Sequence, residues 1–323
     1  MMYSRIAGTG SYLPEKVVTN ADLEKIIDTT DEWIRSRSGI EQRHMAAPEE
    51  TTSTMSTEAA KRAMEAAGVT ADEIDFIVVG TTTPDLVFPN VATMVQMALG
   101  IHDTPALSVE TACSGFMYAL SIADKYIRLG EAKCALVIGA DCLTRIMDWT
   151  NRSTCVLFGD GAGAVILKPA EEPGIVTTII SADGQYRDLL YYPFGVSYGF
   201  DQLRAGAHAG LTMKGNEVFK VAVNTLSRLV DQTLAKAGMQ RTDVDWLVPH
   251  QANLRIIMAA AKKLDLPMEQ VVVTVRQQGN TSAASVPLAL DCAVRDGRIQ
   301  RGQTLLLEAF GGGFTWGSAL IRY

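Results

Sequence analysis

Cys113 is the residue of this chain whose type and setting most directly predict chemistry. It lies in the stretch LSVETACSGF, residues 107–116. The apolar residues before it are typical of a buried strand, and apolar side chains at helical spacing follow it as far as Gly130. Backbone N–H groups and the helix dipole at such a strand-to-helix turn favour the thiolate, the nucleophilic form of cysteine. The alternative is a buried core cysteine with no chemical role.

A histidine, an asparagine and a glycine loop follow other strand-like runs. His250 comes just after the apolar pair 247–248 and before a helix-like segment, and Asn280 ends a QQGN turn. Residues 311–313 are three glycines whose N–H groups could approach an oxyanion. Taken singly, these features also fit a structural histidine, an ordinary Gly-Asn turn and a flexible loop. Together with Cys113, at several strand ends of one fold, they favour a catalytic site.

The elements that must position these residues alternate between strand and helix. Strand-like runs separated by helix-like segments are typical of an α/β fold with buried strands. These runs are residues 77–79, 136–138, 164–167, 247–248, 271–275 and 305–307.

An internal repeat divides the chain. Residues 67–78 (AGVTADEIDFIV) align without gaps with residues 237–248 (AGMQRTDVDWLV), an offset of 170 positions. The same offset pairs Cys113 with Ala283. We therefore expect two duplicated α/β halves, residues 1–172 and 173–323. A pseudo-twofold axis between them would bring equivalent strand ends to one site, and the residues at these ends are Thr81, Thr82, Cys113, His250 and Asn280.

Composition narrows the class of protein. The chain has 323 residues, of which 47% are hydrophobic, enough for a large core. No apolar run reaches the length of a membrane span, and charge and glycine interrupt the first ten residues, so a cytoplasmic protein without membrane partners is expected. Five cysteines without C-x-x-C spacing and four scattered histidines predict neither a disulfide framework nor a metal site. A net charge of −7 disfavours nucleic acid as a partner.

Four motifs in this order resemble the β-ketoacyl-[acyl-carrier-protein] synthase III family of thiolase-fold condensing enzymes. They are TACSG at 111–115, HQAN at 250–253, GNTS at 279–282 and EAFGGG at 308–313. The resemblance extends from the opening GTGSYLP at 8–14 to the closing WGSAL at 316–320. It implies a five-layered αβαβα thiolase-like fold, with the cysteine in the first half and the histidine and asparagine in the second.

The resemblance also implies a reaction. Cys113 would take an acyl group from an acyl-CoA primer, acetyl-CoA or another short acyl-CoA, and release CoA. His250 and Asn280 would donate hydrogen bonds to the thioester carbonyl of malonyl-[acyl-carrier-protein] while CO2 leaves. The carbanion would attack the acyl-cysteine, with the backbone N–H groups of Cys113 and Gly312 as an oxyanion hole. The product would be a 3-oxoacyl carrier protein that starts fatty-acid synthesis, formed without metal or organic cofactor.

The resemblance also implies substrate-binding and partner-binding roles for residues at other positions. CoA would contact Trp33, Arg37 and Arg152. The acyl pocket would contain Leu143, Phe158, Leu189 and Leu211, with Phe88 reaching across a homodimer to cap the partner's pocket. Acyl carrier protein would dock on Lys220, Arg255, Lys262 and Lys263. Each also fits a plainer role: helix packing for Trp33, core packing for the leucines and a solvated basic face for the cations.

The segment 191–210, rich in glycine and aromatic residues, is expected to form an active-site loop. It differs in composition from familiar members of the family, which leaves the primer open. It also leaves open whether malonyl arrives on carrier protein or on CoA.

The same motifs also bear on related and unrelated classes of enzyme. The glycine loop lacks the second cysteine of degradative thiolases, and Asn280 stands where chain-elongating synthases have a second histidine. Condensing enzymes that make quinolones, polyketides or long-chain products share the Cys-His-Asn set and stay open. A papain-like cysteine hydrolase predicts a Cys-Gly-x-Cys-aromatic motif that is absent around Cys113. A non-catalytic thiolase-fold scaffold predicts the loss of one of the three side chains, and all three are present.

Overall fold

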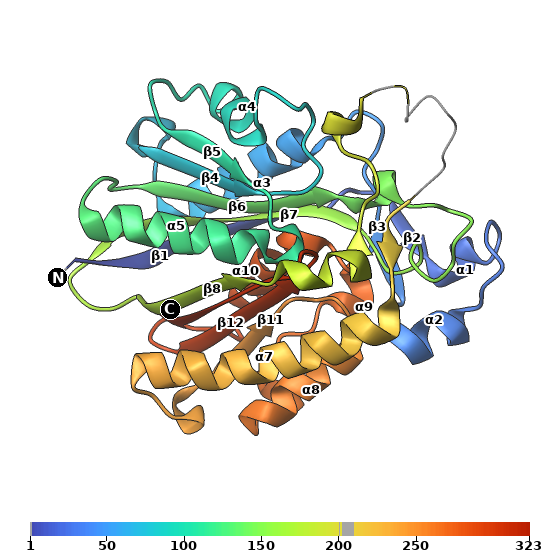
Figure 1. The fold of residues 1–323 in the computed structure, drawn as a ribbon. Helices are drawn as coiled ribbons and strands as arrows, with labels where there is room; N and C mark the ends of the chain where they lie inside the picture. Colours follow the sequence, from blue (N-terminus) through green and yellow to red (C-terminus); the bar gives the residue numbers. More distant parts are fainter. Residues whose placement is uncertain (1, 200, 202–209) are drawn as a thin grey trace.

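Two β-sheets with helices between and outside them form five layers (Figure 1). The fold is known from a computed structural model, which describes residues 2–199, 201 and 210–323. The first sheet has the order β1-β7-β6-β4-β5 and the second the order β11-β12-β13-β8. The strands of the first sheet are β1 (Tyr3–Tyr12), β4 (Phe76–Gly80), β5 (Ala106–Val109), β6 (Ala135–Cys142) and β7 (Asp160–Ala170). Those of the second are β8 (Ile175–Ala182), β11 (Trp246–Pro249), β12 (Thr304–Gly311) and β13 (Thr315–Arg322).

The helices are divided among three layers. The main ones are α3 (Thr52–Ala67), α4 (Val91–Ala98), α5 (Gly115–Leu129), α7 (Gly215–Ala237), α8 (Leu254–Leu264) and α10 (Ser285–Arg295). Helices α5 and α10 are sandwiched between the sheets, in an apolar core that includes Phe116, Leu120 and Leu290. Helices α3 and α4 cover the outer face of the first sheet, and α7 and α8 cover that of the second. These contacts make the αβαβα sandwich that the resemblance predicted.

Shorter elements complete the chain. They are β2 (Val17–Thr19), β3 (Gln42–His44), α1 (Asn20–Leu23), α2 (Asp31–Ser38), β9 (Leu190–Tyr191), β10 (Thr212–Met213) and α9 (Val275–Gln278). Single 3-10 turns, η2 (Ala112–Ser114) and η8 (Ser282–Ala284), precede the two central helices. In the part of the chain that the structure describes, no helix is long and apolar enough to cross a bilayer.

The repeat predicted from sequence is present element by element. Helices α5 and α10 begin at Gly115 and Ser285, 170 positions apart, and the turns η2 and η8 begin at Ala112 and Ser282 with the same separation. Ala112 and Ser282 both adopt left-handed backbone conformations, with φ of 46° and 52°. The division at residue 172 stays a prediction, and it lies in the connection between β7 and β8.

Close backbone contacts bring the two turns to the centre of the first sheet. A Cβ on Gly139 of β6 would lie 2.1 Å from the Ala283 carbonyl oxygen, and one on Gly80 of β4 would lie 2.3 Å from the Gly115 carbonyl carbon. Glycine is therefore required at both positions for these turns to rest on the sheet.

One strand prediction is wrong. Residues 271–275 form an isolated bridge at Val271 followed by α9, not a strand. The Gln251 side chain explains the difference, because its Oε1 accepts hydrogen bonds from the N–H groups of Thr274 and Val275, at 2.8 and 3.1 Å. Its Nε2 donates to the Val272 carbonyl at 2.9 Å. A buried side chain thus takes the backbone bonds that a neighbouring strand would otherwise make.

Candidate active site

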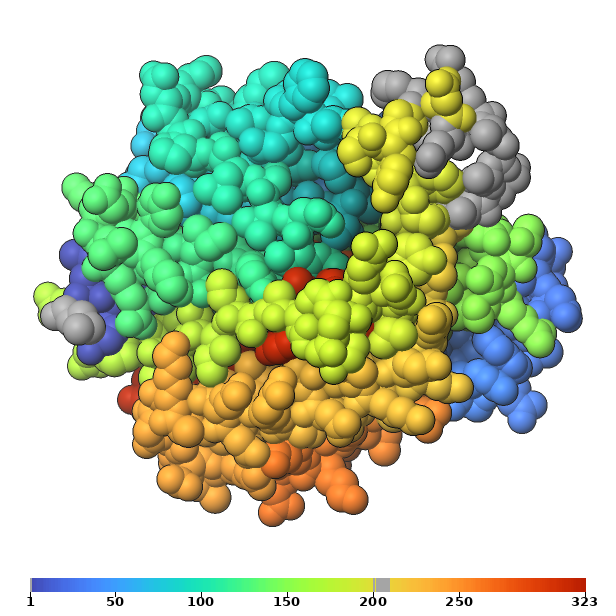
Figure 2. Space-filling view, viewed as in Figure 1, coloured from blue at the N-terminus to red at the C-terminus, as the bar shows by residue number. Residues whose placement is uncertain are grey.

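Cys113, His250 and Asn280 line one cavity of about 1230 Å³ between the two halves of the chain. Figure 2 shows a hollow here, with red atoms from the C-terminal strands visible between green and yellow-green segments. The wall is mainly apolar and also includes Gly312, so all members of the predicted triad and the glycine loop face the same space.

The turn η2 presents Cys113 at the floor of this cavity, directly before helix α5, as the sequence predicted. Cys113 is 8% exposed, and burial raises the pKa of its thiol to about 12 even though the Ser282 hydroxyl donates a hydrogen bond to Sγ at 3.4 Å. Burial of the sulfur thus opposes the expectation that the helix N-terminus favours a thiolate. Desolvation of the charged sulfur outweighs the hydrogen bond.

Asn280 is oriented by the residue two positions after it. Its Oδ1 accepts a hydrogen bond from the Ser282 backbone N–H at 2.9 Å. The Asn280 backbone is fixed by a bridge to Phe158 and by donation from its own N–H to the Leu157 carbonyl at 2.9 Å. Because Oδ1 is held, the Nδ2 amide is the group that Asn280 has left to donate to a ligand.

His250 follows β11 and is 6% exposed. Its backbone N–H donates to the Glu308 carbonyl at 2.7 Å, and its Nδ1 lies 2.5 Å from the Ser285 hydroxyl. Burial lowers the pKa of the imidazole to about 3, so the ring is neutral near pH 7. Cys113 and His250 therefore both rest uncharged, unlike the thiolate–imidazolium pair expected of a papain-like hydrolase.

Asp141, near the end of β6, connects the two halves of the chain behind Cys113 by hydrogen bonds to its carboxylate. Its Oδ2 accepts from the Ala283 N–H at 3.1 Å, and burial raises its pKa. Its Oδ1 accepts bonds from the N–H of Thr82 and the hydroxyls of Thr81, Thr82 and Thr83. Sequence reasoning placed Thr81 and Thr82 at the site but missed Asp141, because an acid inside an apolar strand carries no motif.

The glycine loop packs directly against the nucleophile turn. A Cβ on Gly311 would lie 2.6 Å from the Cys113 nitrogen, so only glycine lets β12 approach this closely. The Thr315 hydroxyl donates to the Thr111 carbonyl at 2.8 Å and accepts from Ser114 at 2.8 Å. These contacts fix the position of the glycine loop relative to the turn η2.

Trp33 and Arg37 line the cavity, whereas Arg152 is not among its lining residues. The two guanidinium carbons are 4.5 Å and 5.1 Å from the centroid of the Trp33 ring, for Arg37 and Arg152. Arg152 also donates to the Asp28 carbonyl at 2.6 Å. Both arginines thus stack on one indole, an arrangement suited to an aromatic base bearing phosphates.

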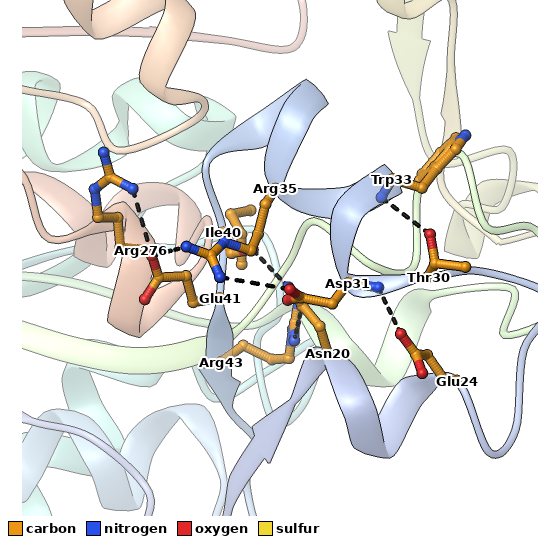
Figure 3. Close-up of polar contacts among 10 residues, drawn as sticks. All are labelled: Asn20, Glu24, Thr30, Asp31, Trp33, Arg35, Ile40, Glu41, Arg43 and Arg276. Carbon is orange, nitrogen blue, oxygen red and sulfur yellow. Dashed lines mark hydrogen bonds and ion pairs between the residues drawn. The ribbon is translucent and has the colours of Figure 1, made fainter.

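Figure 3 shows the polar contacts around helix α2, which carries the cavity-lining Trp33. The Thr30 hydroxyl caps the helix by accepting from the Trp33 N–H at 3.1 Å. Asn20 donates to Asp31 at 2.8 Å and accepts from the fully buried Arg43 at 2.9 Å. Arg43 also donates to the Val156 carbonyl, and burial lowers its pKa to about 10.

Three of the predicted acyl-pocket residues line the cavity and two do not. Leu143, Phe158 and Leu211 form part of its wall. Leu189 instead packs with Phe310 and Phe314, and the next residue, Leu190, faces the cavity. Phe88 is 83% exposed and is not among the residues that line the cavity of its own chain.

The predicted docking residues are spread over two helices. Arg255 lies at the start of α8, lines the cavity and has its guanidinium 5.2 Å from the Phe219 ring. Lys262 and Lys263 lie at the far end of the same helix, and Lys263 forms an ion pair with Asp231 at 2.7 Å. Lys220 lies on α7. Arg255 is therefore the cation of this set that lines the cavity.

The predicted loop 191–210 is described in part. Its cavity-lining residues are Tyr191, Tyr192, Phe194, Gly195, Val196 and Gly199. Residues 200 and 202–209 lie outside the described residues, so the loop assignment stays a prediction there. Among the residues described, no group of three His, Cys, Asp or Glu side chains is placed to hold a metal ion.

Comparisons with known proteins agree with this geometry. Residues 107–184 match the family described as 3-oxoacyl-[acyl-carrier-protein (ACP)] synthase III, and residues 234–323 match its C-terminal family. Residues 38–144 also match the stage V sporulation protein AD family.

Individual relatives cover the whole chain. A β-ketoacyl-[acyl-carrier-protein] synthase III of Xanthomonas campestris is 66% identical over 322 residues, covering 100% of this chain and 99% of the relative. The crystal structure of 3-oxoacyl-[acyl-carrier-protein] synthase III from Aquifex aeolicus has a TM-score of 0.92 at 46% identity, covering 99% and 100% of the two chains. The priming β-ketosynthase of the R1128 polyketide pathway has a TM-score of 0.95 at 36% identity, covering 99% and 96%.

Proposed function

The chain belongs to the β-ketoacyl-[acyl-carrier-protein] synthase III family, and we propose that it joins a short acyl-CoA primer, such as acetyl-CoA, to malonyl-[acyl-carrier-protein]. The products are 3-oxoacyl-[acyl-carrier-protein], CoA and CO2, and the reaction starts a fatty-acid chain. The observation that carries this proposal is the convergence of Cys113, His250 and Asn280 on one mostly apolar cavity. The wall of that cavity also includes Trp33 and Arg37, an indole and a guanidinium suited to CoA.

The first half-reaction transfers the acyl group. The Cys113 sulfur attacks the carbonyl carbon of the acyl-CoA thioester, and the bond from that carbon to the CoA sulfur breaks. The thiol proton passes to the departing CoA sulfur, so the acyl-enzyme and the CoA thiol form without net change in charge. Backbone N–H groups of Cys113 and Gly312 serve the tetrahedral oxyanion. Close packing of the neighbouring Gly311 against the Cys113 nitrogen supports this role, because it fixes the turn and the glycine loop before the charge develops.

The second half-reaction forms the carbon–carbon bond. Loss of CO2 leaves an enolate on the malonyl thioester, and the N–H groups of His250 and Asn280 donate to its oxygen. The carbanion then attacks the acyl-cysteine, and Cys113 leaves as a thiolate that regains a proton. A neutral imidazole suits this work, since it donates a hydrogen bond without adding a buried charge.

We extend the proposal to cofactors, location and assembly. Departure of CO2 drives the condensation, so no cofactor is required, and the enzyme works in the cytoplasm. A homodimer is supported by the exposed apolar residues Leu86, Val87 and Phe88, which are 50, 65 and 83% exposed, and by the edge strand β5 near them. In such a dimer Phe88 would cap the partner's acyl pocket, and sedimentation of wild type and Phe88→Asp measures this assembly directly.

Product analysis tests the reaction. Purified wild type and Cys113→Ser are given acetyl-CoA or longer acyl-CoAs with malonyl-carrier protein or malonyl-CoA, and CoA, CO2 and product mass are followed. A 3-oxoacyl carrier protein from wild type alone supports the proposal, and the best acyl-CoA identifies the primer. Because the chain is also similar to a polyketide priming ketosynthase, condensation restricted to malonyl-CoA or to unusual acyl donors would place it among specialised condensing enzymes. Hydrolysis without condensation would refute both.

A further inference from the structure

Ser285, the first residue of α10, contacts the Nδ1 side of the His250 ring. Its hydroxyl oxygen lies 2.5 Å from Nδ1, and the serine is fully buried. Nδ1 is therefore occupied by the protein. Because His250 lines the cavity, the other ring nitrogen, Nε2, is the one left to bind a ligand there.

A neutral imidazole carries its single proton on one of these two nitrogens. If Nε2 carries it, His250 presents a hydrogen-bond donor to the cavity. If Nδ1 carries it, His250 presents a lone pair, which repels a developing oxyanion. The function of His250 in the proposed condensation, on which this inference rests, requires the first tautomer.

The hydrogen bonds around Ser285 distinguish the two cases. The Gln251 backbone N–H donates to the Ser285 oxygen at 3.3 Å, which occupies one of its lone pairs. Among the residues that the structure describes, Nδ1 is the one acceptor in contact with the hydroxyl proton. A proton on Nδ1 would leave that hydroxyl proton buried without an acceptor, an arrangement that proteins avoid.

We propose that Ser285 is a positioning residue that donates to Nδ1 and holds His250 as the Nε2–H tautomer, with its N–H directed into the cavity. Asn280 is oriented in a parallel way, because the Ser282 N–H holds its Oδ1. One short stretch, residues 282–285, therefore aims both hydrogen-bond donors at the same thioester oxygen.

Nitrogen NMR of the imidazoles tests this directly, because the chemical shifts of Nδ1 and Nε2 report which one is protonated. The chain has four histidines, so selective labelling gives a small set of signals, and His250→Gln identifies the one from His250. Wild-type protein at pH 7 should show His250 protonated at Nε2. Protonation at Nδ1 in the wild type would overturn the proposal without any serine variant.

Ser285→Ala then tests the cause. We expect a mixture of tautomers, a fall in the condensation rate of about tenfold to a hundredfold, and acylation of Cys113 within about twofold of wild type. Ser285→Cys, which keeps a weak donor, should fall between the two. Ser121→Ala is the matched control, since it removes another buried hydroxyl, bonded to Thr178 at 2.9 Å, away from the cavity.

An unchanged tautomer in Ser285→Ala, or equal losses in both half-reactions, would show that Ser285 is merely structural and would overturn the proposal. A wild-type enzyme with the Nε2–H tautomer but no condensed product would refute the proposed function and leave the tautomer assignment intact. The two failures are therefore distinguishable.

Discussion

Alkylation of Cys113 by iodoacetamide gives a quantitative test of how this cavity treats its nucleophile. Burial raises the thiol pKa from about 9 to about 12. The thiolate fraction at pH 7 then falls from about 10⁻² to about 10⁻⁵. A more basic thiolate is a better nucleophile, and a Brønsted coefficient of 0.4–0.5 recovers roughly a factor of 20. Cys113 should therefore react about 50-fold more slowly than an ordinary thiol.

The measurement follows modification of the peptide that contains Cys113 by mass spectrometry, between pH 7 and pH 10. A short peptide with the same TACSG sequence serves as the unfolded reference. The rate in the protein should rise about tenfold per pH unit without reaching a plateau, because the thiolate fraction rises by that factor. Steric shielding slows the reaction equally at every pH and leaves this slope unchanged.

Ser282→Ala sharpens the test. It removes the hydroxyl that donates to Sγ at 3.4 Å, the largest stabilising contact of the thiolate, so alkylation should slow further at each pH. A plateau with a midpoint below pH 8 in the wild type would refute the reasoning. It would mean that the N-terminus of α5 outweighs desolvation and that Cys113 rests as a thiolate.

Three further predictions concern packing, CoA and pH. Gly139→Ala, whose Cβ would lie 2.1 Å from the Ala283 carbonyl, should lower the free energy of unfolding by about 3 kcal/mol in urea, whereas Gly184→Ala, with open space around it, should be nearly neutral. Trp33→Ala should raise the KM for acyl-CoA about tenfold with kcat little changed, and a loss confined to kcat would contradict a binding role. His250 has a folded pKa of about 3 against 6.5 when unfolded, so only the unfolded chain takes up this proton as pH falls from 6.5 to 3. Wild type should lose stability over that range by about 1.4 kcal/mol per pH unit more than His250→Gln, and parallel unfolding curves would contradict the neutral imidazole.

The sequence predicted the site best where the chemistry constrains the type of a residue and the fold constrains its position. The repeat located the turns before α5 and α10, and the motifs brought Cys113, His250 and Asn280 to one cavity. These residues could be found because the chemistry needs those side chains, and because the duplicated strands end at the same place.

Contacts that depend on side-chain direction could not be predicted. In the sequence, Ser282 and Ser285 are typical of small residues in a tight turn. Only the structure shows that their hydroxyls contact Cys113 and His250. The exchange of Leu189 for Leu190 in the cavity wall has the same origin, since the chain changes there from a 3-10 turn that ends at Leu189 to the strand β9 that begins at Leu190.

Separation of the two half-reactions tests the central claim most directly. Wild type, Cys113→Ser, His250→Ala and Asn280→Ala are first incubated with acetyl-CoA and examined for acetyl-cysteine by mass spectrometry. Malonyl-carrier protein is then added and the condensed product is measured. We predict that the His250 and Asn280 variants acetylate Cys113 but yield about a hundredfold less product, while Cys113→Ser yields neither. Undiminished condensation in either of those two variants would contradict the account.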